Sequence, residues 1–263
     1  DYVKQDPVGI DKFVNNLEKI GNSILLLESD DGISWKETDV VPARDCSVPD
    51  LVVGYDERLY LYYVSFPWNK IDLVASEDGI IWEKEEINVD PGLVDPEIVK
   101  VNGVYRLYTN VGEILESEDG RHFDSVGNTL SIMDPTVFEI DEKWYMIGEV
   151  PEEGMILLSS EDGLNFKKEK ILEIDGRVCD AFKNGEEVYL YCHLIEKDNS
   201  KILLYRSKDG VNWDYVGKVY ESDKTVADPT VTYFKGKYYM ALTLVSSEQM
   251  ALTEVLSEKK KDK

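Results

Sequence analysis

The chain has 263 residues, of which 43% are hydrophobic, so it is long and apolar enough to fold around its own core. With 53 acidic and 29 basic residues its formal net charge is −24, which excludes the basic face that a nucleic-acid backbone requires. No apolar run approaches the roughly 20 residues that span a bilayer, so we expect no membrane insertion.

The first 22 residues differ in pattern from the rest of the chain. Apolar side chains recur there at helical spacing, ahead of a stop signal at Gly21, namely Ile10, Phe13, Val14, Leu17 and Ile20. This favours a short helix that packs on the main domain, although Asp6 and Pro7 also fit the beginning of a further strand. We therefore divide the chain into an N-terminal packing segment (1–22), a main domain (23–256) and a charged tail (257–263).

A polar turn closed by an aromatic residue recurs five times along the main domain. Its form is Ser-x-Asp-Gly-x-x-Trp or Phe, and it begins at Ser29, Ser76, Ser117, Ser160 and Ser207. The glycines, at positions 32, 79, 120, 163 and 210, are 47, 41, 43 and 47 residues apart, a period typical of propellers and solenoids. Asp-Gly favours the positive φ angles of a tight hairpin, so we interpret each turn as a structural link between two strands.

A second repeat lies in register with these turns. Each copy begins at an aspartate, namely Asp50, Asp95, Asp134, Asp180 or Asp228. It continues into an aromatic strand such as RLYLYYVS and an aliphatic strand such as KIDLVAS, which leads into the polar turn and a fourth strand. Four antiparallel strands in about 45 residues are typical of a propeller blade, and five copies predict five blades.

The two ends of the main domain complement each other. Residues 23–37 provide a third and a fourth strand without a preceding aromatic strand, whereas the unit that begins at Asp228 provides a first and a second strand. We predict an all-β fold, a five-bladed β-propeller with four-stranded antiparallel blades, whose ring is closed by strands from both termini.

One end of this propeller is expected to hold the functional residues. Because neighbouring strands run antiparallel, the beginning of each first strand and the end of each second strand meet there, and the five aspartates gather around one mouth. The ends of the second strands add Ser65, Asn110, Glu149, His193 and Thr243. These five differ from blade to blade, as the lining of a specific pocket does.

Connecting segments bring further residues to the same end. Arg44 and Arg177 precede two of the aspartates, and Trp68 offers an aromatic face on which a sugar ring can stack. The alternative interpretation is structural: the aspartates cap turns, Glu149 and His193 are ordinary loop and wall residues, and Trp68 packs within its blade. Both interpretations stand at this point.

Five carboxylates around one narrow opening repel one another, so some must have a raised pKa or bind a cation. A raised carboxyl pKa suits acid–base catalysis, and Ca²⁺ is the natural cation for a ring of oxygen atoms. We assign no metal ligands and no required cofactor, with Ca²⁺ in the central tunnel as an option. Cys46, Cys179 and Cys192 lack metal-ligand spacing, and at most one disulfide can form among them.

The Asp-Pro starts of the inner strands, the aromatic second strands and the Ser-x-Asp-Gly hairpins together resemble the five-bladed propellers of glycoside hydrolase families 43, 32, 68 and 130. Over residues 23–256 the pattern is most similar to family 43, the arabinanase and xylosidase group. Families 32 and 68 are disfavoured because the chain has no Arg-Asp-Pro or Glu-Cys motif. The resemblance implies hydrolysis with inversion by three acids: an Asp as general base, a second Asp that tunes it, and a Glu that protonates the leaving oxygen.

By position, the resemblance assigns the base to Asp50 and the tuning role to Asp134. Where the family pattern has the acidic Glu, this chain has Asp180, and the substitutes to consider are Glu149 and Glu97. The predicted catalytic set is therefore Asp50, Asp134, Asp180 and Glu149. The predicted substrate-binding set is Asp95, Asp228, Glu97, Asn110, His193, Ser65, Thr243, Arg44, Arg177 and Trp68.

Three functions fit the sequence. The first is a glycosidase that cleaves an oligosaccharide or a polysaccharide with a pair of carboxyl groups. The second is a non-catalytic propeller that binds glycans or proteins through the same mouth, which the missing Glu favours. The third is a glycoside phosphorylase in which Arg44 and Arg177 hold phosphate. We favour an extracellular or cell-surface location over the cytoplasm, and the oligomeric state is left open.

Overall fold

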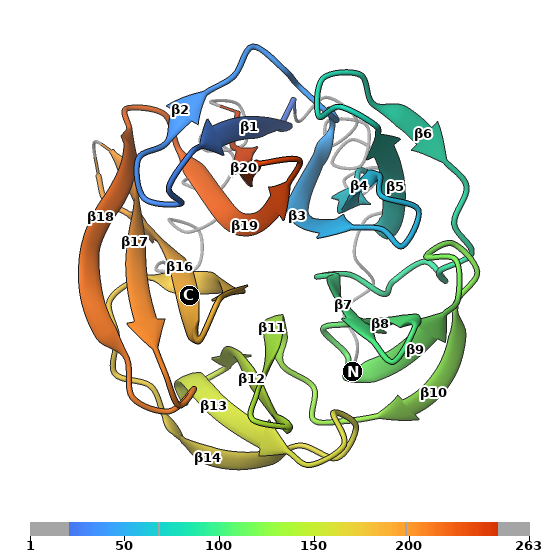
Figure 1. Cartoon of the computed structure of the whole chain (residues 1–263), viewed down its shortest axis with the longest axis vertical. Helices are drawn as coiled ribbons and strands as arrows, with labels where there is room; N and C mark the ends of the chain where they lie inside the picture. Colours follow the sequence, from blue (N-terminus) through green and yellow to red (C-terminus); the bar gives the residue numbers. More distant parts are fainter. Residues whose placement is uncertain (1–20, 68, 198, 247–263) are drawn as a thin grey trace, which may run out of the picture.

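The computed structural model describes residues 21–67, 69–197 and 199–246. Within these residues, twenty β-strands form five four-stranded antiparallel sheets around a central axis (Figure 1), which confirms the predicted all-β five-bladed propeller. No helix in this part of the chain is long and apolar enough to cross a membrane. The predicted helix of the packing segment (1–22), the stacking role of Trp68 and the charged tail (257–263) fall outside the described residues.

The first strand of each blade lies nearest the axis and the fourth lies at the rim (Figure 1). In strand order the blades are blade 1, β3 (Cys46–Val53), β4 (Leu59–Ser65), β5 (Lys70–Ser76) and β6 (Glu83–Glu85); blade 2, β7 (Glu97–Val101), β8 (Val104–Tyr108), β9 (Glu113–Ser117) and β10 (Asp124–Asn128); blade 3, β11 (Met133–Ile140), β12 (Lys143–Val150), β13 (Gly154–Ser160) and β14 (Lys167–Ile171); blade 4, β15 (Arg177–Asn184), β16 (Glu187–Ile195), β17 (Ser200–Ser207) and β18 (Asp214–Ser222); and blade 5, β19 (Val226–Phe234), β20 (Lys237–Leu244), β1 (Ser23–Ser29) and β2 (Lys36–Glu37).

Blade 5 is shared between the two ends of the described chain. β1 pairs antiparallel with β20 along its whole length, from Ser23 opposite Leu244 to Ser29 opposite Tyr238. This pairing closes the ring and leaves neither strand with an open edge, as the sequence predicts.

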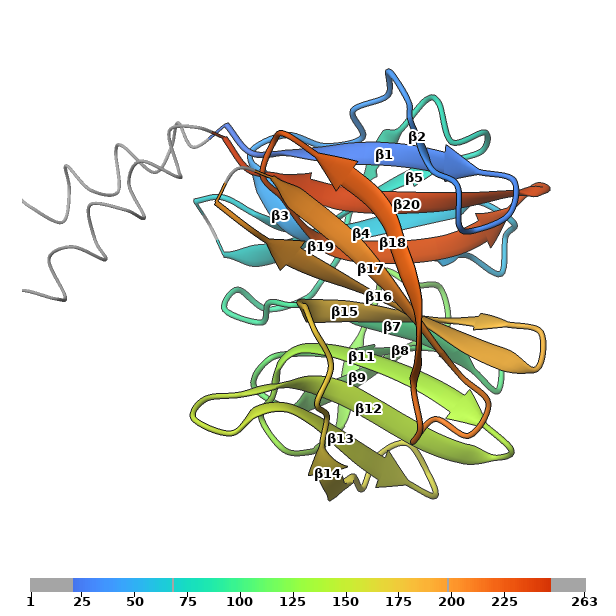
Figure 2. The ribbon, with the colours of Figure 1, turned by 90° about the vertical axis from the view of Figure 1, so that its left-hand side faces the viewer.

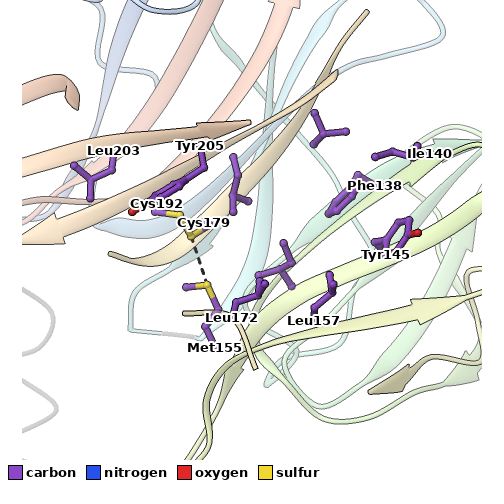
Figure 3. Packing of buried hydrophobic residues seen from close by; sticks show 13 residues of the cluster. Phe138, Ile140, Tyr145, Met155, Leu157, Leu172, Cys179, Cys192, Leu203 and Tyr205 are labelled. Atoms are coloured by element: carbon purple, nitrogen blue, oxygen red, sulfur yellow. Dashed lines mark hydrogen bonds between the residues drawn. A yellow bond between two sulfur atoms is a disulfide. The ribbon is translucent and has the colours of Figure 1, made fainter. Parts of the chain in front are cut away.

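The core lies between neighbouring blades. Each sheet is covered on both faces by its neighbours, so the middle strands are mainly apolar rather than alternating, and every residue of β4 is buried. Figure 3 shows one such layer, in which Phe138, Tyr145 and Leu157 of blade 3 belong to the same cluster as Leu203 and Tyr205 of blade 4. Blade-to-blade packing therefore fixes where each first strand meets the axis.

The Ser-x-Asp-Gly turns lie at the end of the propeller away from the beginnings of the first strands (Figure 2). In the first turn, the Gly32 amide donates to Ser29 Oγ over 3.0 Å, and the Ile33 and Ser34 amides donate to Asp31 Oδ1 over 2.8 and 2.7 Å. The five glycines have positive φ angles of 69° to 77°. The side chains thus satisfy the backbone donors of the hairpin, as the sequence predicts.

These turns also join neighbouring blades. The Tyr62 hydroxyl of blade 1 donates to the Gly120 carbonyl of blade 2, and Tyr108 of blade 2 does the same to Gly163 of blade 3, both over 2.8 Å. A Cβ at Gly120 would lie 2.8 Å from the Tyr62 hydroxyl oxygen, so the close approach requires glycine. The repeated turns are therefore structural links.

Candidate active site

Three successive residues of each blade surround the axis at the other end. The triplets are Val48-Pro49-Asp50, Asp95-Pro96-Glu97, Asp134-Pro135-Thr136, Val178-Cys179-Asp180 and Asp228-Pro229-Thr230. They are equivalent because the first residue of every triplet has a positive φ, between 39° and 54°. This conformation is rare for residues other than glycine and marks the same point in all five blades.

The triplets divide the site into two rings. We call the partly exposed first residues the mouth ring, which comprises Val48, Asp95, Asp134, Val178 and Asp228. We call the buried third residues the deep ring, which comprises Asp50, Glu97, Thr136, Asp180 and Thr230.

The five aspartates all line one opening, as expected, but they lie at two depths. Asp50 and Asp180 lie two positions further into the propeller than the other three. The reason is the position of each aspartate within its triplet: Asp50 and Asp180 are third residues, whereas Asp95, Asp134 and Asp228 are first residues. Because the positive φ marks the first residue in every blade, matching the repeats on their aspartates hides this offset of two residues.

The deep ring joins each blade to the next. Every side chain in it accepts the backbone N–H of the neighbouring blade's next residue, from Ile98 to Asp50 (2.7 Å), Val137 to Glu97 (2.6 Å), Ala181 to Thr136 (2.8 Å), Val231 to Asp180 (2.8 Å) and Leu51 to Thr230 (2.9 Å). The last bond returns to blade 1 and closes a circle of five hydrogen bonds. Buried backbone donors need such acceptors, so this ring has a structural role whatever else it does.

The deep ring also concentrates buried acid. Burial raises the pKa of Asp50 to about 7 and, together with the neighbouring carboxyl groups, raises the pKa values of Glu97 and Asp180 well above their usual range. One carboxylate oxygen from each lies within 4.8 Å of the others. Oxygen atoms at this spacing can share Ca²⁺ at its usual bond length of about 2.4 Å, so these three residues could hold the cation and stay ionised.

In the mouth ring, the surroundings of Asp134 favour the protonated form of its carboxyl group most strongly. Burial raises the pKa of Asp134 to about 8, and the charges of Asp95, Asp228 and Glu149 raise it in the same direction. The Asp134 amide donates to Asp95 Oδ2 over 3.5 Å, and burial raises the pKa of Asp95 as well. At neutral pH we therefore expect a proton to be held at Asp134.

Asp228 is held differently. Its carboxyl group accepts a hydrogen bond from the Thr243 hydroxyl, and its own amide donates to Nδ1 of His193 over 3.0 Å. Burial raises the pKa of Asp228 above its ordinary value, and the hydrogen bond from Thr243 offsets only part of this. The two carboxyl groups thus differ in their partners: other acids crowd Asp134, whereas Asp228 has a hydroxyl donor.

A polar edge flanks the mouth ring on blades 3 and 4. Arg177 Nη1 lies 3.4 Å from Glu149 Oε1. Because His193 Nδ1 accepts the Asp228 amide proton, the neutral ring carries its own proton on Nε2. Burial lowers the pKa of His193 to about 4, so the ring is neutral at physiological pH and can donate from Nε2.

The remaining predicted residues lie further from the rings or serve the local backbone. Ser65 donates to the Lys70 carbonyl, and the Asn110 side-chain oxygen accepts the Val94 amide ahead of Asp95. Arg44 is exposed and pairs through its backbone with Ser23. Of the predicted second-strand residues, the contacts bring Glu149, His193 and Thr243 to the mouth ring. Their roles in binding stay predictions.

Blade 4 differs from the other blades at the middle residue of the triplet. The other four have proline there, whereas blade 4 has Cys179, which forms a disulfide with Cys192, the residue before His193 (Figure 3). Their Cα atoms are 4.1 Å apart on paired strands. The sequence left the disulfide open because the pairing register was needed to place Cys192.

Sequence reasoning missed Val48, Val178, Thr136 and Thr230 as ring members. The signal was present: aligning the second triplet residue, which is Pro in four blades, brings all four into the two rings without reference to the aspartates.

Comparison with known proteins gives a match of fold. No family model and no curated protein matches the chain. Among solved structures, an α-L-arabinofuranosidase from Clostridium thermocellum ATCC 27405 is similar with a TM-score of 0.59 and 19% identity over 74% of this chain and 80% of that one. The α-L-arabinanase of Cellvibrio cellulosa gives a TM-score of 0.57 and 16% identity over 77% and 90%. The endo-arabinase of Bacteroides thetaiotaomicron VPI-5482 gives 0.56 and 14% over 76% and 94%.

The chain has the five-bladed propeller fold of the family 43 glycosidases. This bears out the resemblance seen in the sequence. At identities of 14% to 19% the likeness concerns the fold, so the chemistry has to be argued from the two rings.

Proposed function

We propose that this protein is a carbohydrate-active propeller that hydrolyses glycosidic bonds of an oligosaccharide or polysaccharide with inversion. The observation that carries the proposal is the contrast within the mouth ring. Asp134 lies among other acids with its pKa raised to about 8, whereas the Asp228 carboxylate in the same ring accepts a hydrogen bond from Thr243, which opposes the effect of burial on its pKa. Inverting hydrolysis needs this combination of a protonated and an ionised carboxyl group on either side of the scissile bond.

The narrowness of the centre sets where the substrate would bind. The cavity between the rings has a volume of about 20 Å³, which is room for one water molecule. A sugar ring would therefore lie across the mouth ring and not inside the tunnel. There Asp134 would donate its proton to the leaving oxygen while an ionised carboxylate of the ring takes a proton from the attacking water.

The proposal changes the roles that the resemblance implied. Asp50 and Asp180 are buried and accept the amide protons of the next blade, so we give them no proton-transfer role. Glu149 contacts Arg177 at the edge of the mouth, and we assign both, together with Nε2 of His193, to binding sugar hydroxyl groups. Such a small set of placed polar groups is typical of a carbohydrate pocket.

A second candidate, a propeller that binds glycans without cleaving them, is favoured by one observation. Valine occupies the mouth ring in blades 1 and 4, as Val48 and Val178, which are the blades in which the resemblance places the base and the acid. A mouth with two of five positions apolar can bind a sugar face while lacking one acid of the pair.

The test is release of reducing sugar from a panel of α-arabinosides, β-xylosides, galactans and fructans, with arabinans first because solved structures of the same fold are arabinanases. The wild type is compared with Asp134→Asn and with Asp124→Asn, which removes the same charge from the exposed strand β10. We expect turnover that falls about 10²- to 10⁴-fold in Asp134→Asn only, the usual effect of removing a general acid.

The other outcomes separate the alternatives. No turnover on the whole panel, combined with a glycan that raises the melting temperature, would support the binding propeller. Turnover that requires added phosphate would indicate a phosphorylase instead.

A further inference from the structure

We infer that Asp228 is the general base of the proposed hydrolysis, and that Thr243 and His193 are positioning residues that fix its carboxylate and its backbone. This inference rests on the proposed function and goes beyond it, because the resemblance placed the base in blade 1, at Asp50. It moves the base to blade 5, the blade that the two ends of the chain build together.

The hydrogen bonds around Asp228 carry the argument. Thr243 Oγ1 accepts the Val48 amide over 3.0 Å and donates its own proton to the Asp228 carboxylate. Thr243 is 2% exposed and lies at the end of β20, whereas Val48 comes from blade 1. The Val48 amide thus holds Thr243 Oγ1 as a donor to Asp228, and this hydrogen bond fixes the direction of the carboxylate and opposes the burial that raises its pKa.

His193 fixes the backbone of Asp228. Its Nδ1 accepts the Asp228 amide over 3.0 Å, and Nδ1 lies 3.9 Å from Asp228 Oδ1. Asp228 has a φ of +52°, a strained conformation for a residue other than glycine. The bond from His193, which comes from the neighbouring blade, holds the backbone in this conformation and leaves the carboxylate in the mouth.

The charges that face Asp228 are Asp95 and Asp134 in the mouth ring and the neutral His193, which in turn lies near Glu149 and Arg177. A charge on Asp95 disfavours a charge on Asp228, and so does Asp134 once it has lost its proton. The hydrogen bond from Thr243 opposes this repulsion, so removal of Thr243 shifts the balance toward the protonated, inactive base.

The proposed step conserves atoms and charge. Water attacks the anomeric carbon from the side of Asp228, and its proton passes to the Asp228 carboxylate. The bond between the anomeric carbon and the leaving oxygen breaks, and the leaving oxygen takes the proton of Asp134. One water is consumed, and exchange of protons with solvent restores both carboxyl groups.

The experiment measures kcat and kcat/KM between pH 4 and 9 on the glycoside of the panel that the wild type hydrolyses fastest. We expect Asp228→Asn to lose about 10²- to 10⁴-fold in kcat. Thr243→Val should lose about 10- to 100-fold, as expected for one hydrogen bond to a charged group, and should move the acidic limb of the pH profile to higher pH. Thr243→Ser, which keeps the hydroxyl, should restore both.

His193 is tested by a matched pair. His193→Leu removes the acceptor for the Asp228 amide and should lower kcat, whereas His193→Asn offers an oxygen near the position of Nδ1 and should recover most of it. Asp223→Asn, an exposed residue ahead of β19, serves as the charge control. Melting temperatures of all variants establish that each is folded under the assay conditions.

The outcomes distinguish this inference from the proposed function. If Asp228→Asn keeps its turnover while Asp134→Asn loses it, Asp228 is not the base and the glycosidase stands. If Thr243→Val loses turnover with an unmoved acidic limb, the positioning role of Thr243 is wrong. If the wild type hydrolyses nothing, the proposed function itself fails.

Discussion

At the turn end of the propeller Asp31 lies among backbone N–H groups, and at the mouth end Asp134 lies among other carboxyl groups. The amides of Ile33 and Ser34 lower the pKa of Asp31 to about 2, whereas burial and neighbouring acids raise the pKa of Asp134 to about 8. The same residue type is therefore repeated at both ends with opposite electrostatics. The surroundings decide whether an aspartate closes a turn or holds a proton.

A second contrast lies within the mouth end itself. Asp50 and Asp134 both lie beside a proline at the beginning of a first strand, yet Asp50, after its proline, accepts a backbone hydrogen bond from the next blade, and Asp134, before its proline, lies in the mouth ring. A difference of two positions along the strand therefore distinguishes a structural aspartate from a proposed catalytic one. Each prediction below tests one side of these contrasts.

The largest expected effect is on the pH dependence of stability. The raised pKa values of Asp134 and Asp50 contribute stability below the unfolded value of 3.8 that is lost as the pH rises toward about 8 and about 7. The lowered pKa of Asp31 has the opposite sign, and its contribution is lost as the pH falls from 3.8 toward about 2. Melting temperatures in EDTA should therefore peak near pH 4 to 5.

Two variants distinguish the effect of the mouth ring on the melting temperature from the effect of the overall negative charge. Asp134→Asn should flatten the loss of melting temperature between pH 5 and 8, whereas Asp124→Asn, on the exposed β10, should leave its slope nearly unchanged. A melting temperature that rises steadily from pH 4 to 8 in the wild type would contradict the raised pKa values.

The disulfide of blade 4 gives the next largest effect. Replacing both Cys179 and Cys192 by alanine should lower the free energy of unfolding by about 2–4 kcal/mol, because the bond links residues 13 positions apart and so restricts the unfolded chain. Urea unfolding with and without a reductant measures it. The wild type should lose stability on reduction while the double variant does not respond, and a wild type insensitive to reductant would argue against the bond.

The deep ring is tested with a variant that keeps its acidic residues. Thr230→Val keeps the shape of the side chain but leaves the buried Leu51 amide without its acceptor and Asp50 Oδ1 without the Thr230 hydroxyl, which should cost about 1–3 kcal/mol of stability. Turnover at a temperature where the variant is folded should be unchanged. Thr232→Val, on the same strand outside the ring, is the control. Equal losses in the two variants would mean that the circle of hydrogen bonds adds nothing specific.

The turn end gives the smallest effect. Asp209→Ala removes the acceptor of the Val211 and Asn212 amides and should cost about 1 kcal/mol, comparable to loss of a helix cap, with no change in turnover. Lys208→Ala in the same turn is the control and should be nearly neutral. A loss of turnover in Asp209→Ala would contradict a purely structural role.

The sequence predicted the fold well because the repeated parts depend on local chemistry. Ser-x-Asp-Gly favours a hairpin wherever it occurs, and apolar runs such as that of β4 mark strands that are covered on both faces. Closure of the ring was also predictable, because each end of the chain provides only two of the four strands of blade 5. The antiparallel direction of the strands was enough to predict which end of the propeller holds the mouth.

Most of the arrangement of the site could not be predicted from the sequence because it depends on contacts between strands and between blades. The depth of Asp50 is an exception: Asp50 follows Pro49, whereas Asp134 precedes Pro135, and matching the repeats on the proline reveals this offset. The bond between His193 and Asp228 joins two blades, and the charges that raise the pKa of Asp134 come from three other residues. A local sequence motif cannot predict such combined effects of residues that are distant in the sequence.

The most direct test of the account is a ¹³C NMR titration of the aspartate carboxyl groups, with resonances assigned by Asp→Asn substitution. We predict that Asp31 titrates near pH 2, at the turn end, and that Asp134 titrates near pH 8, at the mouth. An Asp134 that titrates near the ordinary value of about 4 would contradict the account, because the mouth would then hold no protonated acid at neutral pH.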